Sequence, residues 1–369
     1  MKILFLSNSI GGLKSFRYEL IESMIRLGNR VYIASPIEAD PGLFKELGCE
    51  IIETQMSQRG LNPLKEIRCI FEYKKLLKSI KPDIVFAYTI KPNIYGSIAC
   101  RQCGVPIIAS VTGLGVALER KGLLQKITIW LYRFGLKKTD CVYFQNQESV
   151  DFFVQNKIPH NNYVLSPGSG VNLKKFEYTQ YPQDDKEIHF LFISRILEKK
   201  GIQQYLDAAV YHKSISPNTY FHIVGIRDDV RYDKQIEELS KQGIIIYHGQ
   251  QNDVRPFIAQ AHCLVHPSYY PEGLSNVLLE SAAMGRPAIT TDKAGCKEVV
   301  VDSITGYITK QQDSKDLIHK IGRFIGLPHD EKKKMGMAAR KRVEEIFDRN
   351  LVVKSYLDTA NKILEEYGK

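Results

Sequence analysis

The strongest constraint on the fold is an alternation of short β-rich runs with amphipathic stretches, which starts twice along the chain. Such alternation predicts parallel strands with helices between them, in a doubly wound sheet. The strand candidates of the first series are KILFLS, RVYIAS, DIVFAY, VPIIASV and DCVYFQ, and those of the second are IHFLFIS, TYFHIVG, IIIYHG, HCLVHPS and RPAITT. A turn-rich stretch at residues 167–185 separates the series, and 369 residues suffice for about two domains.

We therefore predict an α/β protein of two doubly wound, Rossmann-like parallel-sheet domains that face each other across a cleft. The N-terminal domain is expected over residues 1–170 and the C-terminal domain over residues 171–348. Residues 349–369 predict an amphipathic helix, and their pattern alone also fits a plain terminal helix of the second domain. Ligands of open α/β sheets bind at the carboxyl ends of the strands, so residues that follow strands are the candidates for function.

Composition limits the class of protein. A hydrophobic content of 44% and a charged content of 25% are typical of a soluble globular chain. No apolar run approaches the roughly 18 residues of a membrane span, and the first strand lacks the start of a signal peptide. These features predict a cytoplasmic protein. Its seven cysteines include one C-x-x-C, Cys100 and Cys103, without a second pair at zinc spacing, which favours buried free thiols over a metal site.

The net charge of +10 is concentrated in one region, because residues 59–138 hold 15 Lys and Arg against 4 Asp and Glu. Such a surplus favours an acidic partner. Residues 119–138, ERKGLLQKITIWLYRFGLKK, interleave the cations with Trp130, Tyr132 and Phe134. This pattern is typical of a helix at an anionic membrane surface, and a core helix with a basic outer edge would give a similar one. The sequence shows no nucleic-acid-binding module.

The most informative single stretch is YYPEGLSNVLLESAAMGRPAI, residues 269–289. Ser275 or Asn276 can cap a helix that Gly285 ends, so the turn from Gly273 places backbone N–H groups at a helix N-terminus. That arrangement suits a diphosphate, and carboxylates at Glu272 and Glu280 suit sugar and ribose hydroxyls. The alternative is that both glutamates are surface charges near a helix cap.

Two further stretches follow predicted strands. SRILEKKG, residues 194–201, places Arg195 and Lys200 where both can reach a diphosphate, although a solvated basic turn is the alternative. Gly11 and Gly12 follow the first strand and allow close backbone approach to a phosphate. No G-x-G-x-x-G or P-loop motif stands at such a junction, which argues against a nicotinamide enzyme or a P-loop nucleotidase.

Together these stretches resemble glycosyltransferase family 4, a large family of retaining enzymes with the GT-B fold. The resemblance covers nearly the whole chain, and its most specific part is the E-x7-E spacing from Glu272 to Glu280. PGSGVNLKKF at the junction and AGCKEVVVDSITGYI, residues 294–308, support it. In such enzymes the C-terminal helix crosses back to the first domain.

The resemblance implies roles for individual residues. Glu272 would contact the sugar of a UDP-sugar donor, Glu280 its ribose, and Arg195 and Lys200 its leaving diphosphate. The other donor-binding positions would form a phosphate cradle from backbone groups: Gly11, Gly12, Gly273, Leu274, Ser275, Asn276 and Val277. Glu272, Arg195 and Lys200 are thus the catalytic candidates. No cofactor is implied, and because the chain has no D-x-D pair, we expect no metal.

The stretches TIKPNIYGSIACRQCGVP and VTGLG resemble a subgroup that builds bacterial capsule, O-antigen or glycan chains on undecaprenyl diphosphate. Some members transfer N-acetylgalactosamine or a uronic acid relative. A lipid-linked acceptor would place the protein at the inner face of the cytoplasmic membrane. Many family members have a histidine where this chain has Val111–Gly115, so the acceptor-side group stays open, with Tyr88, Lys91 and Glu119 as candidates.

Two other functions fit the same fold. A UDP-sugar epimerase would bind the same donor and release an isomerised sugar without an acceptor. A non-catalytic sugar-binding protein would keep the fold with a degraded donor site, and the set of Glu272, Glu280, Arg195 and Lys200 argues against it.

Overall fold

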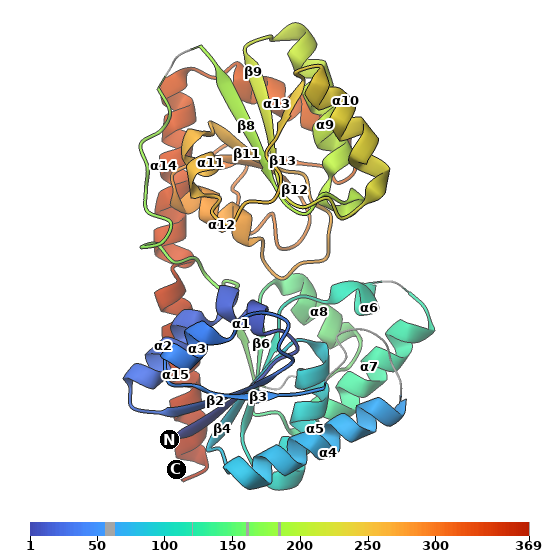
Figure 1. Cartoon of the computed structure of the whole chain (residues 1–369), viewed down its shortest axis with the longest axis vertical. Helices are drawn as coiled ribbons and strands as arrows, with labels where there is room; N and C mark the ends of the chain where they lie inside the picture. Colours follow the sequence, from blue (N-terminus) through green and yellow to red (C-terminus); the bar gives the residue numbers. More distant parts are fainter. Residues whose placement is uncertain (56–62, 120, 160–161, 184–185, 369) are drawn as a thin grey trace. The chain divides into compact units, whose positions relative to one another are not determined.

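The computed structural model describes residues 1–55, 63–119, 121–159, 162–183 and 186–368, in two compact units (Figure 1). Unit 1 comprises Met1–Ser169 and Arg349–Lys369, and unit 2 comprises Gly170–Asp348. Each unit is a parallel sheet with helices on both faces, which confirms the predicted fold class.

The sheet of unit 1 has seven parallel strands in the order β3-β2-β1-β4-β5-β6-β7. They are β1 (Lys2–Leu6), β2 (Arg30–Ser35), β3 (Glu50–Glu53), β4 (Ile84–Tyr88), β5 (Ile107–Val111), β6 (Cys141–Phe144) and β7 (Tyr163–Leu165). Every residue of β4 and β5 is buried. A strand covered on both faces needs apolar side chains at all positions, which explains the continuous apolar runs of these segments.

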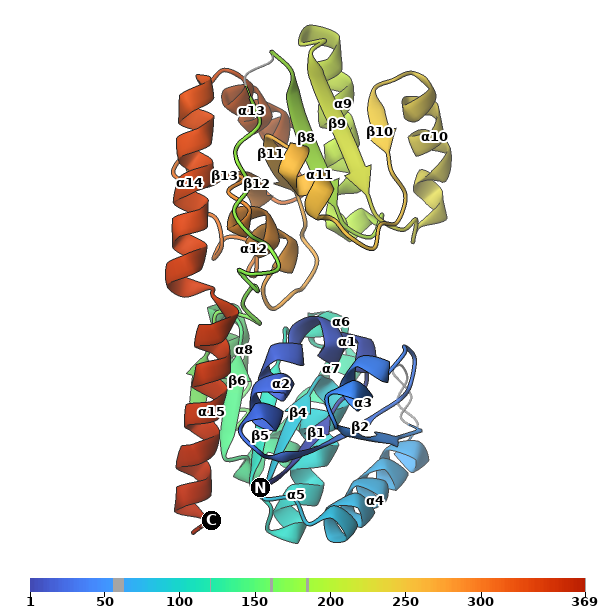
Figure 2. The ribbon, with the colours of Figure 1, turned by 60° about the vertical axis from the view of Figure 1, so that its left-hand side comes forward.

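The helices of unit 1 cover the sheet in two layers (Figure 2). They are α1 (Ile10–Phe16), α2 (Tyr18–Arg26), α3 (Gly42–Glu46), α4 (Pro63–Ile80), η1 (Pro92–Gly96), α5 (Ser97–Cys103), α6 (Gly115–Glu119), α7 (Leu123–Gly135), η2 (Leu136–Lys138), α8 (Gln147–Gln155) and α15 (Arg349–Glu366). The core of one face takes buried side chains from α4, α5, α7 and α8. The core of the other face takes them from α1, α2, α3 and α15.

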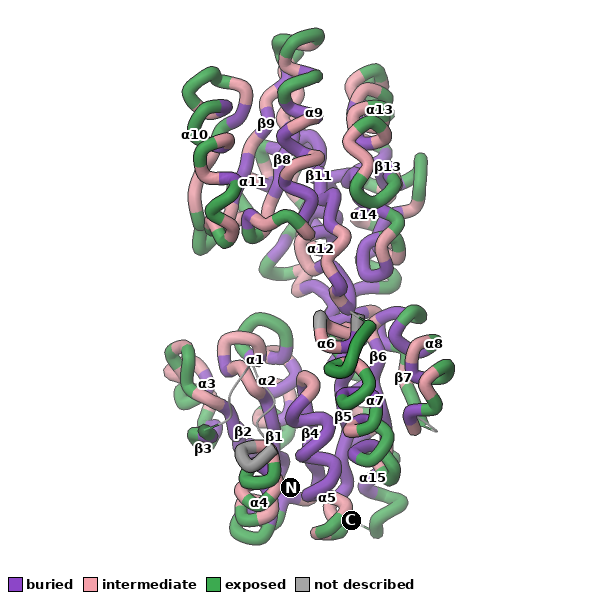
Figure 3. The backbone as a smooth tube through the Cα atoms, turned by 90° about the vertical axis from the view of Figure 1, so that its right-hand side faces the viewer, coloured by how far each residue is buried: buried purple, intermediate pink, exposed green. Residues whose placement is uncertain are grey.

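Unit 2 repeats the topology with six parallel strands in the order β10-β9-β8-β11-β12-β13. They are β8 (Ile188–Ile193), β9 (Thr219–Val224), β10 (Ile245–Tyr247), β11 (Cys263–His266), β12 (Ala288–Thr291) and β13 (Gly306–Thr309). The helices are η3 (Glu198–Lys200), α9 (Ile202–Ile215), η4 (Val230–Tyr232), α10 (Asp233–Lys241), α11 (Arg255–Gln260), α12 (Asn276–Ala283), α13 (Ser314–Ile325) and α14 (His329–Ile346). α9, α10 and α13 pack on one face, and α11, α12 and α14 on the other, so the central strands are buried (Figure 3).

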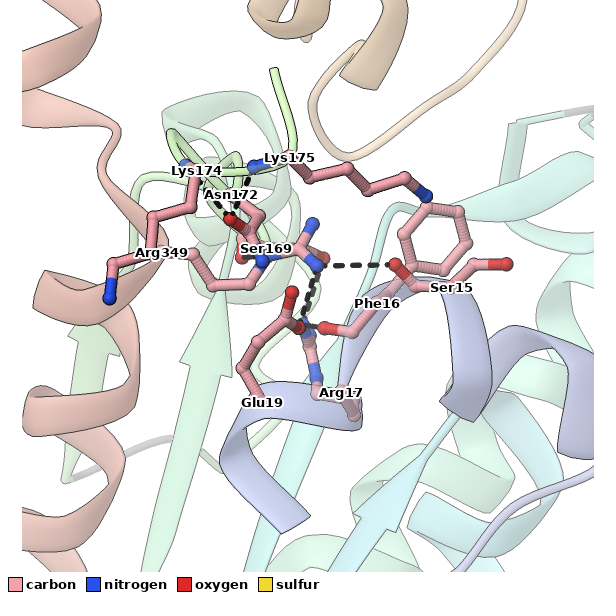
Figure 4. A network of polar contacts seen from close by, with 9 residues as sticks. All are labelled: Ser15, Phe16, Arg17, Glu19, Ser169, Asn172, Lys174, Lys175 and Arg349. Atoms are coloured by element: carbon pink, nitrogen blue, oxygen red, sulfur yellow. Dashed lines mark hydrogen bonds and ion pairs between the residues drawn. The ribbon is translucent and has the colours of Figure 1, made fainter. Parts of the chain in front are cut away.

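The terminal helix α15 packs within unit 1. Its Tyr356 stacks on Tyr143 of β6 with ring centroids 3.9 Å apart, and its hydroxyl is 2.9 Å from Ser110 Oγ. At its start, Arg349 donates to the carbonyl oxygens of Ser15 and Ser169 and pairs with Glu19 (Figure 4). Unit 1 consists of two chain segments, one that ends at Ser169 and one that begins at Arg349. Hydrogen bonds of Arg349 hold these two segment ends together beside the start of α2.

All ten strand candidates named from the sequence form strands, whereas three strands were missed. The missed strands are β3, β7 and β13, which lie at sheet edges and have four, three and four residues. Edge strands this short have too few positions to show a hydrophobic period.

All seven cysteines are unpaired and only Cys103 is not fully buried. Within the described residues, no helix has both the length and the apolarity that crossing a membrane requires.

Candidate functional site

The candidate site of unit 2 lies where its strand order changes direction. β8 has β9 on one side and β11 on the other, and crossovers that leave in opposite directions open a crevice at the carboxyl ends of such strands. Arg195 and Lys200 follow β8, and Glu272 and Ser275 follow β11. The fold therefore brings the two stretches that the sequence singled out to the same edge of the sheet.

Lys200 and Glu272 form an ion pair at this edge, with 10% and 21% of their side chains exposed. Lys200 ends the short helix η3, and the following Gly201 has φ +76°, where a Cβ would overlap the carbonyl oxygen of Pro267. Glycine is thus required for the turn that packs Lys200 against the β11 loop. Burial lowers the pKa of Lys200 to about 8, so the ammonium form still predominates at neutral pH.

Tyr270 joins Arg195 to this pair, and sequence reasoning did not assign it a role. The Lys200 ammonium lies 5.0 Å from the centre of the Tyr270 ring, and the Arg195 guanidinium lies 5.7 Å from it. Arg195 also donates to Asp228 at 2.9 Å, in a pair whose side chains are about half exposed. Exposed pairs of this kind contribute little stability, so Arg195 can exchange Asp228 for an anionic ligand at small cost.

The first turn of α12 presents backbone N–H groups at the same edge. Ser275 occupies the N-cap position, yet within this described segment its side chain makes no capping hydrogen bond. Its hydroxyl lies instead 3.1 Å from Nε2 of His266, the last residue of β11. The first i to i−4 bond of the helix runs from Leu279 N to Ser275 O, so the N–H groups of Asn276, Val277 and Leu278 precede the intrahelical ladder.

The loop after β12 fixes the entry to α12. Ser275 N donates to Gly295 O at 2.8 Å, and Gly295 N donates to Glu298 Oε2 at 2.7 Å. Gly295 has φ +91°, and a Cβ there would lie 2.9 Å from Gly273 O. A larger residue would therefore push away the turn that carries Glu272. The glycine of the AGCKE stretch is the sequence signal that could have identified this contact.

Glu280 lies one turn inside α12 and is half-buried. It shares the helix with the N–H groups of Asn276 and Val277. Gly273 and Leu274 are buried in the turn before the helix. The predicted donor-binding positions of unit 2 are thus held by one turn, one helix end and the residues after β8.

In the predicted glycine turn of unit 1, the backbone already binds a carboxylate of the same chain, that of Glu38. Gly11 N donates to Glu38 Oε1 at 3.1 Å, and Gly12 N donates to Ser9 Oγ at 2.9 Å. Ser9 Oγ in turn donates to Glu38 at 2.5 Å. Although burial acts to raise it, the hydrogen bonds from Ser9, Gly11 and Ile10 lower the pKa of Glu38 below its ordinary value. A phosphate can use the N–H of Gly11 only after this carboxylate moves.

The three acceptor-side candidates lie in different settings. Tyr88 is buried, its hydroxyl has no hydrogen-bond partner among the described residues, and burial raises its pKa well above the ordinary value. Lys91 is buried in an ion pair with Glu66 at 2.7 Å. Glu119 ends α6, and its side chain lies outside what the structure describes. Thr89, which lies between Tyr88 and Lys91 in the sequence, has a strained backbone with φ +76°. The sequence pattern did not predict this conformation.

Family models match both halves of the chain. The model of glycosyl transferases group 1 matches residues 174–342, and the glycosyl transferase 4-like model matches residues 2–146. The chain belongs to the glycosyltransferases. The recognition of this family from the E-x7-E stretch is thereby confirmed, together with the enzyme class.

The glycosyltransferase is similar to two curated bacterial enzymes over much of its length. It is 25% identical to the N,N'-diacetylbacillosaminyl-diphospho-undecaprenol alpha-1,3-N-acetylgalactosaminyltransferase of Campylobacter jejuni, over 99% of this chain and 100% of that enzyme. It is also 25% identical to the UDP-Gal:alpha-D-GlcNAc-diphosphoundecaprenol alpha-1,3-galactosyltransferase of Escherichia coli, over 72% of each chain. A solved structure of HepE from Anabaena with UDP-glucose shares the GT-B fold, with a TM-score of 0.78, 17% identity and coverage of 98% of this chain and 100% of that chain.

Proposed function

We propose that the protein is a retaining hexosyltransferase that moves a sugar from a UDP-sugar to a hydroxyl of a lipid-diphosphate-linked saccharide. We favour an N-acetylhexosamine or a uronic relative as the sugar, in the assembly of a bacterial surface polysaccharide or glycan. The observation that carries the proposal is the Lys200–Glu272 pair beside the first turn of α12, at the point where the strand order of unit 2 changes direction. The names of both curated relatives support the lipid-diphosphate-linked acceptor, and the name of the Campylobacter jejuni relative supports an N-acetylhexosamine as the sugar.

Each residue of the unit 2 site receives a role from its position. The N–H groups at the start of α12 suit the diphosphate, because a helix N-terminus favours negative charge. Lys200 and Arg195 would neutralise the charge that grows on the diphosphate as the glycosidic bond breaks. Glu272 would exchange part of its contact with Lys200 for hydroxyls of the donor sugar, and Glu280 would accept from the ribose hydroxyls.

The same groups define the mechanism that we propose. The sugar–phosphate bond breaks while the acceptor hydroxyl approaches from the same face, and the leaving diphosphate takes the acceptor's proton. Catalysis would then rest on charge stabilisation and positioning rather than on a side-chain nucleophile. Among the described residues, no cluster of His, Cys, Asp and Glu is placed to hold a metal ion. We expect activity to persist in excess EDTA, and loss that magnesium or manganese restores would contradict the metal-independent proposal.

Product release tests the proposed reaction. The purified protein is incubated with a panel of UDP-sugars, with and without an undecaprenyl-diphosphate-linked saccharide, and UDP and the mass of the lipid product are measured. A transferase releases UDP and extends the lipid only when both substrates are present. An isomerised sugar without an acceptor would identify an epimerase instead, and no turnover with any donor would contradict the proposal.

A lipid-linked acceptor requires access to a membrane, and α7 offers a surface for it. Leu123, Ile127, Trp130 and Phe134 recur at helical spacing and are 74%, 40%, 62% and 43% exposed. Ile129 and Tyr132 on the other side of α7 are buried in the unit 1 core. The outer stripe is therefore not part of the core, and this supports a membrane surface over a core helix with a basic outer edge.

A second apolar stripe lies on α4, which covers the same face of the unit 1 sheet as α7. Ile67 and Phe71 are 52% and 63% exposed, and Lys74 lies 5.9 Å from the Phe71 ring centre. Exposed cations flank the α7 stripe at Lys121, Lys126, Arg133, Lys137 and Lys138, whereas Arg59 and Arg120 lie outside the described residues. Apolar groups bordered by cations suit the headgroup region of an anionic bilayer, so we propose peripheral binding at the inner face of the cytoplasmic membrane.

Trp130 makes this proposal directly measurable, because it is the only tryptophan of the chain. Anionic vesicles should shift its fluorescence to shorter wavelength and should co-sediment the protein. Glutamate at Lys121, Lys126, Lys137 and Lys138 should abolish both effects. The matched control places glutamate at four exposed lysines of unit 2, Lys234, Lys241, Lys334 and Lys341, and should still bind. An unshifted Trp130 spectrum in wild type, or equal loss in the control, would contradict the α7 surface.

A further inference from the structure

The start of α12 departs from the usual behaviour of its residue type. Serine at an N-cap normally accepts a hydrogen bond from a first-turn N–H. Ser275 holds the N-cap position with an extended backbone, φ −79° and ψ 108°, but makes no such bond within this described segment. Its hydroxyl bonds His266, and both side chains are about 1% exposed. The N–H groups of the first turn are therefore not covered by the residue best placed to cover them.

His266 is a neutral donor to this hydroxyl. Burial, and then the charge of Lys200, lower the pKa of His266 well below its ordinary value, so the ring carries one N–H. Nδ1 is buried without a partner among the described residues. Buried N–H groups are rarely left unpaired, whereas acceptors are left so more often. The proton is thus assigned to Nε2, which donates to Ser275 Oγ. The hydroxyl oxygen can still accept a second bond, but the bond to His266 holds it in an orientation in which it makes no capping bond within this described segment.

We propose that His266 is a positioning residue that withholds the Ser275 hydroxyl from α12 and thereby keeps the first-turn N–H groups available to the donor diphosphate. The inference rests on the proposed function, because it assumes that the diphosphate binds at this helix end. As a positioning residue, His266 is not expected to touch either substrate. It acts through Ser275, whose backbone N is fixed separately by Gly295 O at 2.8 Å.

A pair of variants of similar size isolates the donor. In His266→Gln the side-chain amide can present an N–H near the position of Nε2, whereas His266→Met fills a similar volume without one. In His266→Met the Ser275 hydroxyl is released to cap the helix, and we expect the UDP Kd to rise about tenfold, which corresponds to about 1.4 kcal/mol. His266→Gln should stay within about threefold of wild type on the same basis. Calorimetric UDP binding and thermal melting are measured for each variant.

The decisive variant is the double substitution His266→Met with Ser275→Ala. It removes the competing hydroxyl together with the histidine, so UDP affinity should return to that of Ser275→Ala alone. If His266 only supports packing, the opposite is expected: the double variant would bind UDP no better than His266→Met does. That result, or equal Kd values for His266→Gln and His266→Met, overturns the proposal.

Two further comparisons keep the test decisive. If His266→Met does not fold, Ser275→Asn in the His266 background supplies a longer capping side chain and should weaken UDP binding more than Ser275→Ala does. Equal loss in both would overturn the inference. Wild-type protein that binds no UDP would instead overturn the proposed function, and with it the site on which the inference rests.

Discussion

The two units share one topology, but a helix start at the carboxyl edge of the sheet has different partners in each: α1 after the first strand of unit 1, and α12 after the fourth strand of unit 2. In both, the strand order changes direction at the first and fourth strands of the unit, β1 and β4 or β8 and β11. In unit 1, Glu38 and Ser9 satisfy the N–H groups of Gly11 and Gly12. In unit 2, the Ser275 hydroxyl is turned toward His266 and makes no capping bond to α12 within this described segment. The side chains at the two helix ends thus differ although the fold is shared, and on this difference we base the expectation that unit 2 binds the donor diphosphate.

Buried lysine–glutamate pairs show the same contrast. Lys91 pairs with Glu66 in unit 1 at 2.7 Å, with 11% and 13% of the side chains exposed. Lys200 pairs with Glu272 in unit 2 next to Tyr270 and within reach of the Arg195 charge. The two pairs are buried to a similar degree and differ in position, because the second lies at the sheet edge where the strand order of unit 2 changes direction and where we expect a ligand. A ligand can therefore compete for the charges of the second pair.

Among the substitutions that test this difference between the units, removal of the Lys200 charge should have the largest effect on turnover. Lys200→Met should lower kcat by about 10²- to 10³-fold, the usual cost of removing one group that stabilises transition-state charge. The UDP Kd should rise less, because the diphosphate charge grows as the bond breaks. Steady-state kinetics with a lipid acceptor and calorimetry with UDP measure the two effects.

Lys199→Met is the matched control, since it changes the neighbouring residue by the same substitution. Because the loss of Lys200 leaves Glu272 without its cation, melting curves must accompany the kinetics, and the double variant with Glu272→Gln removes the stranded charge. A Lys200→Met protein that melts as wild type and loses affinity as much as kcat would refute the leaving-group role.

Glu280→Ala should give the next effect in size. It removes the acceptor for the ribose hydroxyls, and leaving such groups unpaired costs about 1–3 kcal/mol, or roughly 5- to 150-fold in UDP affinity. Glu298→Ala is a useful comparison, since Glu298 accepts from Gly295 N and affects the loop rather than the ribose. Unchanged UDP affinity in a folded Glu280→Ala protein would show that the E-x7-E assignment is wrong.

Titration of Lys200 should change kcat, and the effect should be smaller than those of the Lys200 and Glu280 substitutions. Because the pKa of Lys200 is about 8, kcat should fall as the pH rises through that value, by at most about tenfold per pH unit. In Lys200→Arg the charge persists and the decline should disappear. The pKa of Lys200 is depressed on folding, so folding disfavours its charged form, and its titration cannot itself destabilise the protein above pH 8. A wild-type profile that stays flat to pH 10 would contradict the charge requirement.

The sequence predicted the strongly patterned parts of the molecule and missed those set by tertiary contacts. The ten named strands have apolar runs long enough to be recognised, and Arg195, Lys200 and Glu272 follow strands, where ligand residues are expected. By contrast, the role of His266 depends on a 3.1 Å contact with Ser275 across a loop. No local pattern encodes that contact, and serine before a helix ordinarily predicts a cap.

For a related reason the sequence did not reveal what the glycine turn of unit 1 contacts. Gly11 and Gly12 do give an accessible backbone, but the residue that uses it is Glu38, which is 27 positions further along the chain from Gly11. β2 ends at Ser35, three residues before Glu38, and lies beside β1 in the sheet. Parallel pairing thus brings the carboxylate to the turn, and only the sheet order reveals it.

The smallest effect expected concerns Glu38 and tests whether the unit 1 turn takes part in donor binding at all. Glu38→Gln keeps an oxygen acceptor for Ser9 and Gly11 but removes the negative charge. If the donor diphosphate must displace this carboxylate, its removal should tighten the UDP Kd by about two- to threefold, since surface charge effects at a helix start are typically 0.3–1 kcal/mol. The same substitution should cost a similar amount of stability in chemical unfolding, because the helix start loses its anion. Glu46→Gln, at an exposed glutamate of α3, controls for the loss of one charge. Lower stability with an unchanged UDP Kd would mean that the Gly11–Gly12 turn is an internally satisfied helix start, and that unit 2 alone binds the donor diphosphate.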